Sequence, residues 1–306
     1  MIDLITYPYS KGYCLNLSDG NNWWVTGYKD GIEYSARFAN ILRLKECSPN
    51  NSPKLIFSAH QETEKESHSF DISAPESNTG WRFCENDVVS MWYHNDSNDV
   101  ICEFKNNSMR ENLQYLAMWL SLQPIFHRSV KMGGLPFHSA LAECNGKGVL
   151  FVAHGGRGKS TCCRRLPSHW KPLCDDETLV VLDKDNRYRA HPFPTWSDYL
   201  NKRAENSWDV QYSVPVSAIF LIQQAESDRI AELSKLNIPF CMSVFANHVL
   251  GRYPQYIQQM TQKEQNEVKE HIFNNAFDIT KSIPILQLRV SLNGRFWEEI
   301  EKILGL

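Results

Sequence analysis

Short runs that alternate between apolar and polar residues dominate the first hundred positions, a pattern typical of β-strands with one buried face. The five residues 95–99 are all Asn, Asp or Ser, which favour turns, so a hairpin is predicted around them. Apolar residues at helical spacing predict one helix over 32–44, and the polar segment 62–69 is expected to be a solvated loop. The predicted strands are 23–25, 54–57, 88–93 and 100–104.

A longer amphipathic segment separates this region from the rest of the chain. Its spacing predicts a helix over 109–126, with Ser108 as N-cap and Glu111 at the capping-box position. The glycines and proline of 131–136 then interrupt the pattern, and we place a domain boundary there. The predicted units are a β-rich N-terminal domain over 1–130 that ends in a helix, and a second domain over 131–306.

Beyond this boundary, predicted strands and helices alternate, which favours an α/β domain. The Asn145-Gly146 pair predicts a tight hairpin turn between its first two strands. The predicted strands are 137–143, 148–153, 178–182, 217–222 and 285–290. The predicted helices are 159–166, 262–277 and 296–304.

A glycine-rich segment joins an apolar strand to one of these helices: Gly155, Gly156, Arg157, Gly158, Lys159, Ser160 and Thr161. Glycines let successive backbone N–H groups face an anion, and the start of a helix adds partial positive charge. In a phosphate loop of this kind, Lys159 would contact the β- and γ-phosphates of ATP and Ser160 would bind Mg²⁺. Ala153 stands where the strict pattern has glycine, so an ordinary glycine-rich turn is the alternative.

Two adjacent carboxylates, Asp175 and Asp176, stand just before the apolar run 178–182. Phosphoryl transfer needs a carboxylate for Mg²⁺ and another to accept the proton of the attacking hydroxyl. The alternative is a solvated acidic turn. His138 lies upstream of the glycine-rich segment, and a lone histidine is more often structural than catalytic.

Together, His138, the 155–160 loop and the aspartate pair resemble the catalytic domain of HPr kinase/phosphorylase, whose core is shared with phosphoenolpyruvate carboxykinases. The resemblance spans 137–183 and implies a P-loop kinase domain of α/β (α+β) class. It implies that Lys159 binds phosphates, that Ser160 and one aspartate hold Mg²⁺, and that His138 lies by the γ-phosphate or the carboxylates. Our preference is Asp176 as the metal ligand and Asp175 as the base.

Two features depart from HPr kinases. Thr161 stands where they usually have glutamate, and the aspartates are not followed by a counterpart of their second signature, which contains arginine and asparagine. That signature is tied to oligomer contacts and to the reverse phosphorolysis reaction, so neither property is carried over.

A closer similarity, on segments 158–166, 173–178 and 191–197, is to the HPr-kinase-related protein of SynChlorMet cassettes. These bacterial cassettes encode radical-SAM enzymes and a presumed modified peptide, and related kinases of lasso-peptide clusters phosphorylate a precursor serine. The similarity implies γ-phosphate transfer from ATP to a Ser or Thr hydroxyl on a peptide or small protein. It gives the radical-SAM enzymes and further copies of the chain as candidate partners. The alternatives are a non-catalytic nucleotide-gated module that presents the peptide, and a simple NTP hydrolase.

Composition adds expectations about the partners, the location and the cysteines of the chain. The 306 residues carry a net charge of −3 and are 42% hydrophobic, which suits two folded domains and does not favour nucleic acid as partner. Neither a signal peptide nor a run long enough to span a membrane is seen, so a cytoplasmic location is expected. The nine cysteines form no Cys-x-x-Cys pair and are expected to be reduced thiols. The proline-spaced segment 191–196 is expected either to shape the acceptor pocket or to be a rigid structural loop.

Overall fold

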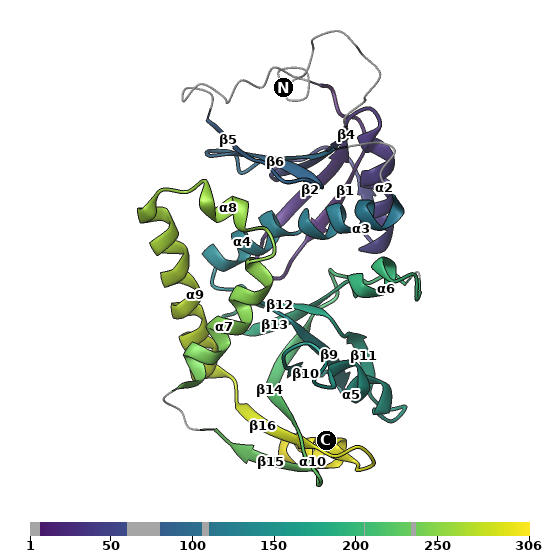
Figure 1. The fold of residues 1–306 in the computed structure, drawn as a ribbon, viewed down its shortest axis with the longest axis vertical. Coiled ribbons are helices and arrows are strands. Elements are labelled where there is room, and N and C mark those ends of the chain that lie inside the picture. The colour runs from purple at the N-terminus through teal and green to yellow at the C-terminus, as the bar shows by residue number, and fades with distance from the viewer. Residues whose placement is uncertain (1–6, 60–79, 106–109, 205, 234–236) are drawn as a thin grey trace.

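The protein is described by a computed structural model over residues 7–59, 80–105, 110–204, 206–233 and 237–306. It contains two mixed sheets, one built before residue 105 and the other after residue 134, with helices between and beside them (Figure 1). The fold is therefore mixed α and β. The segment 62–69, expected to be a loop, lies outside the described residues.

The first sheet has seven strands in the order β3-β1-β2-β4-β7-β6-β5. They are β1 (Gly12–Asn16), β2 (Asn22–Gly27), β3 (Lys45–Cys47), β4 (Lys54–Ala59), β5 (Trp81–Cys84), β6 (Val89–His94) and β7 (Val100–Phe104). Strand β4 runs parallel to β2 and β7, and the remaining pairs are antiparallel. The predicted hairpin is confirmed as β6 and β7.

Helix α2 (Gly31–Ile41) covers one face of this sheet and confirms the helix predicted over 32–44. Its Phe38 ring packs 5.1 Å from the ring of Phe57 in β4. The helix starts so close to the sheet that a Cβ on Gly31 would collide with the Phe57 carbonyl, so glycine is required there.

The expectation that all cysteines are thiols is wrong for two of them. Cys14 in β1 and Cys47 in β3 form a disulfide, with their Cα atoms 5.9 Å apart. Antiparallel pairing of β1 with β3 brings together residues that are 33 positions apart in sequence, and no local motif announces that pairing. The other seven cysteines are free, and all of them except Cys241 are buried.

The single helix predicted over 109–126 is also wrong, because the structure has two shorter helices, α3 (Glu111–Leu120) and α4 (Gln123–Lys131). Pro124 lies in the first turn of α4, where its missing N–H costs no helical hydrogen bond, so a new helix starts there. The predicted cap Ser108 lies outside the described residues, and Arg110 occupies the N-cap position without a side-chain capping bond.

The second sheet has nine strands, with the path β11-β9-β10-β14-β13-β12-β8 and with β16 pairing both β14 and β15. They are β8 (Leu135–Phe137), β9 (Ser139–Cys144), β10 (Lys147–Val152), β11 (Lys171–Cys174), β12 (Glu177–Leu182), β13 (Tyr188–Phe193), β14 (Val214–Gln224), β15 (Arg229–Glu232) and β16 (Ile285–Val290). Strands β10, β14 and β16 run parallel as neighbours. The hairpin of β9 and β10 turns at Asn145 and Gly146, which both have positive φ, as the Asn-Gly pair predicts.

The strand predicted over 137–143 is divided by a bend at His138. Before the bend, β8 pairs with β12; after it, β9 pairs with β10 and β11. His138 therefore marks the point at which the chain passes from one part of the sheet to another.

The helices of this part of the chain are α5 (Lys159–Arg165), α6 (Trp196–Leu200), α7 (Ile238–Leu250), α8 (Pro254–Gln258), α9 (Gln262–Ser282) and α10 (Phe296–Leu304). Helices α7 and α9 pack against each other and against β8, while α10 lies on β15 and β16 (Figure 1). One hydrophobic cluster extends from the first sheet through α4 to the second sheet, for example where the rings of Phe126 and Phe193 lie 5.0 Å apart. Independent folding of the predicted domains 1–130 and 131–306 stays a prediction.

Candidate active site

The glycine-rich loop leaves β10 at the centre of the second sheet and leads into α5. Gly156 and Gly158 have φ values of 72° and 104°, the left-handed region that favours glycine. A Cβ added at Gly155, Gly156 or Gly158 would meet no other atom within 4 Å. The loop backbone therefore borders open space, and its glycines allow a ligand to approach it closely.

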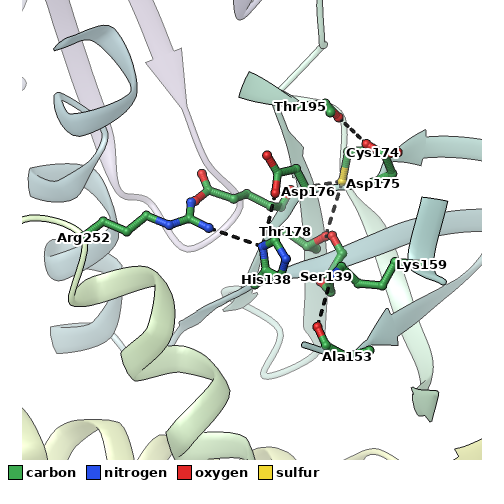
Figure 2. A network of polar contacts seen from close by, with 11 residues as sticks. His138, Ser139, Ala153, Lys159, Cys174, Asp175, Asp176, Thr178, Thr195 and Arg252 are labelled. Atoms are coloured by element: carbon green, nitrogen blue, oxygen red, sulfur yellow. Dashed lines mark hydrogen bonds and ion pairs between the residues drawn. The ribbon is translucent and has the colours of Figure 1, made fainter. Parts of the chain in front are cut away.

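Lys159 lies back across this loop. Its Nζ donates a hydrogen bond to the carbonyl of Ala153 at 3.0 Å, and only 6% of the residue is exposed (Figure 2). Burial lowers the pKa of Lys159, although the nearby charges of Asp176 and Asp175 oppose that shift. The lysine and the aspartate pair thus lie within electrostatic reach of one another.

His138 and Asp176 form a buried ion pair at the site. Their Nδ1 and Oδ1 atoms are 3.2 Å apart, and both side chains are largely buried (Figure 2). Burial alone would raise the pKa of Asp176, but His138, followed by Arg252 and Lys159, outweighs it and the pKa is lowered. Asp176 is therefore held as a carboxylate, the form that binds a cation.

Asp175 points away from its neighbour. The Thr195 hydroxyl donates to Asp175 Oδ1 at 2.6 Å, and Figure 2 shows the two aspartates directed to different partners. Divergent side chains allow the two carboxylates to serve separate tasks.

The turn that carries both aspartates is fixed by neighbouring polar groups. The Cys174 thiol donates to the Glu177 carbonyl at 3.0 Å, and Thr178 Oγ1 donates to the Ser139 carbonyl at 3.3 Å (Figure 2). The first bond closes the turn and the second ties it to β9, so the positions of Asp175 and Asp176 follow from the sheet.

A pocket of about 530 Å³ brings Lys159, Ser160 and Asp175 together. Its far wall comes from the segment around α6, with Thr195 and Asp198. Burial and then the Asp175 charge raise the pKa of Asp198, which shows that carboxylates gather on this wall.

The two ends of the segment 191–196 lie in different surroundings. Thr195, at its end, lines the pocket. His191 is fully buried elsewhere, with Nδ1 2.8 Å from the Val210 carbonyl and Nε2 accepting from the Ser18 N–H at 3.1 Å. His191 is therefore a structural residue that connects the second sheet to the first.

Comparison with known families bears on this region. The model of the SynChlorMet cassette protein ScmC family matches residues 100–305. The chain belongs to this family. No curated protein matches it. The match takes in the glycine-rich loop, both aspartates and His138, so the whole candidate site lies in the family region, whereas β1 to β6 precede it.

Two residues of this family region complete the site and were not predicted from the sequence. Arg252 follows α7 and forms an ion pair with Glu177, which is 1% exposed. Its Nη2 also lies 3.3 Å from His138 Nδ1 (Figure 2). Its guanidinium covers the Trp119 ring at 4.2 Å. Burial lowers the pKa of Arg252 to about 10, so it stays charged at neutral pH.

A sequence pattern could have pointed to only one of these two residues as part of the site. Glu177 directly follows the aspartate pair as a third acid before an apolar strand. Arg252 reaches the site because α7 packs on β8, and no motif marks that contact.

The oxygen donors at the site fit Mg²⁺. This ion takes one or two protein carboxylates and completes its octahedron with phosphate oxygens and water. Asp176, Asp175 and the Ser160 hydroxyl supply donors of that kind. Within the described part of the chain, no group of three or more His, Cys, Asp or Glu residues is arranged to hold a metal ion by itself.

Proposed function

We propose that the chain is an ATP-dependent kinase of the HPr-kinase-like P-loop type that phosphorylates a Ser or Thr hydroxyl of a peptide. The observation that carries the proposal is the pocket in which Lys159, Ser160 and Asp175 meet, beside the Asp176–His138 pair. A cationic group, a hydroxyl and two carboxylates beside an open glycine loop are what transfer of a phosphoryl group requires.

In this proposal, the loop N–H groups and Lys159 hold the phosphates of ATP. Asp176 and Ser160 would hold Mg²⁺, which when bound neutralises charge on the phosphates. Asp176 suits that task because its pKa is lowered and it remains anionic.

Asp175 would accept the proton of the acceptor hydroxyl. It lines the pocket, and Thr195 orients one of its oxygens. As the proton moves to Asp175, the acceptor oxygen bonds to the γ-phosphorus and the bond to the β–γ bridging oxygen breaks, which releases ADP.

Membership of a SynChlorMet cassette family supports a peptide as the acceptor and the cassette enzymes as partners. A second candidate, NTP hydrolysis, is favoured by the same pocket, because Asp175 could deprotonate water as well as a peptide hydroxyl.

The test is to incubate the protein with γ-labelled ATP, Mg²⁺ and the precursor peptide of a SynChlorMet cassette. We expect labelled peptide, with the site located by mass spectrometry and lost when the acceptor Ser or Thr is replaced by Ala. Label that appears only as free phosphate would support the hydrolase instead. Absence of any ATP turnover would contradict both.

A further inference from the structure

A second pocket of about 350 Å³ lies on the other side of the glycine loop. In the strand order, β9 and β11 lie on one side of β10, with the aspartates directly after β11, whereas β14 and β16 lie on its other side. This second pocket opens at the carboxyl ends of β14 and β16, which run parallel to β10. The carboxyl edge of parallel strands is where α/β sheets bind ligands.

The two pockets adjoin at the loop, because Gly158, Thr161 and Gln224 line both. The aspartate side must receive the reacting phosphate, since the carboxylates are there. If the γ-phosphate of a nucleotide lies on the aspartate side of the loop, its nucleoside must extend to the other side. Resting on the proposed function, we infer that the second pocket binds the nucleoside of the phosphate donor.

The walls of the second pocket suit a nucleobase. Ile222, Val290 and Leu292 supply an apolar surface, and Leu292 is 79% exposed although it is a large hydrophobic side chain. A flat aromatic ring placed on this surface would remove it from water. The volume is within the range of small-molecule sites.

Few polar groups are free to recognise the base edges. Arg165 already donates to the Ser291 carbonyl at 2.7 Å and to the Gly294 carbonyl, and the Ser291 hydroxyl accepts from the Gly294 N–H. Thr161 Oγ1 accepts from Arg164 at 3.5 Å. Arg157 and Gln224 are both exposed and on long flexible side chains. The pocket therefore selects by ring area: ATP and GTP bind similarly, and both bind more tightly than UTP.

The test measures binding of the Mg²⁺ complexes of ATP, GTP, UTP and inorganic tripolyphosphate by calorimetry. Tripolyphosphate carries the phosphates without a nucleoside. The variant is Leu292→Asn, which keeps the side-chain size but removes the apolar contact. Its matched control is Ile303→Asn, which changes an apolar residue of 50% exposure in α10 that does not line the pocket.

We expect Leu292→Asn to weaken ATP binding by about tenfold, the scale of one buried leucine contact, and to leave tripolyphosphate unchanged. Ile303→Asn should change neither affinity. Equal affinity of the wild type for ATP and tripolyphosphate, or equal ATP affinity of the two variants, would overturn the nucleoside pocket. The proposed function would then survive if Lys159→Ala abolished tripolyphosphate binding, whereas a wild-type protein that binds neither probe would overturn both.

Discussion

Arg252 and Glu177 form an ion pair that joins the end of α7 to the turn carrying the aspartates. Glu177 is 1% exposed, so its charge is almost removed from water, and Arg252 is its cationic partner. Because Arg252 Nη2 also lies 3.3 Å from His138 Nδ1, this residue links the helical layer of α7 to the centre of the candidate site.

Loss of Arg252 should leave a buried carboxylate without a partner. We expect Arg252→Gln to lower the free energy of unfolding by about 3–5 kcal/mol, the usual cost of breaking a buried pair. The double variant with Glu177→Gln should be less destabilised than the single one, because it removes the uncompensated charge. Urea denaturation of the four proteins of this cycle measures the coupling, and additive effects would show that the pair is not coupled.

Lys159 should be required for nucleotide binding. The loop segment 155–160 carries two cationic side chains, Lys159 and Arg157, and of these Lys159 is buried whereas Arg157 is exposed. We expect Lys159→Ala to weaken Mg·ATP binding by about 10- to 100-fold, the scale of one charge-assisted hydrogen bond. The affinities are measured by calorimetry, with Lys171→Ala, at an exposed lysine of β11, as the control. An unchanged affinity of Lys159→Ala for Mg·ATP would show that Lys159 does not bind the phosphates.

His191 should make stability depend on pH. Burial lowers the pKa of His191 to about 4, against 6.5 for the free side chain. The unfolded state therefore binds the proton more readily between these values, and stability falls as pH decreases from about 6.5 towards 4. The contribution is about 1.4 kcal/mol per pH unit in that window.

The measurement compares urea denaturation of the wild type and His191→Gln at pH 7 and pH 5. The variant also loses the bonds to Ser18 and Val210, so the informative quantity is the difference between the two pH values, which should shrink. An equal difference in both proteins would mean that His191 is not the titrating group. The remaining pH dependence should come from groups such as His127, whose pKa burial lowers to about 3.

Local sequence patterns predicted several elements of the second domain well. Apolar runs fixed β16 and α10 at their observed bounds, and the Asn145-Gly146 pair identified its hairpin. These features depend on residues that are near one another in sequence, so the pattern contains the information. The glycine loop between β10 and α5 belongs to the same class.

Other features depend on packing between distant segments, and the sequence did not predict them. The bend at His138 follows from pairing of β8 with β12, and the disulfide of Cys14 and Cys47 follows from the position of β3. Arg252 joins the site only because α7 packs on β8. For the same reason, the motif could place Asp175 and Asp176 near the loop but could not show which partner each would face.

The two aspartates should fail in different ways when each is changed to Asn, which keeps the shape and removes the charge. Asp176→Asn should lose Mg²⁺-dependent ATP affinity, because it removes the carboxylate that His138 and Lys159 keep ionised. Asp175→Asn should keep that affinity. Titration of each variant with ATP in the presence and absence of Mg²⁺ separates the two, and the reverse pattern would exchange their roles.

The most direct test of the kinase proposal is the rate at which the Asp175→Asn variant transfers label from γ-labelled ATP to the cassette peptide at saturating Mg·ATP. General-base assistance contributes about 10²–10⁴-fold to such reactions, so the rate should fall by at least about a hundredfold while ATP binding is retained. Transfer at the wild-type rate would contradict the account and leave Asp175 as a residue of an ordinary acidic turn.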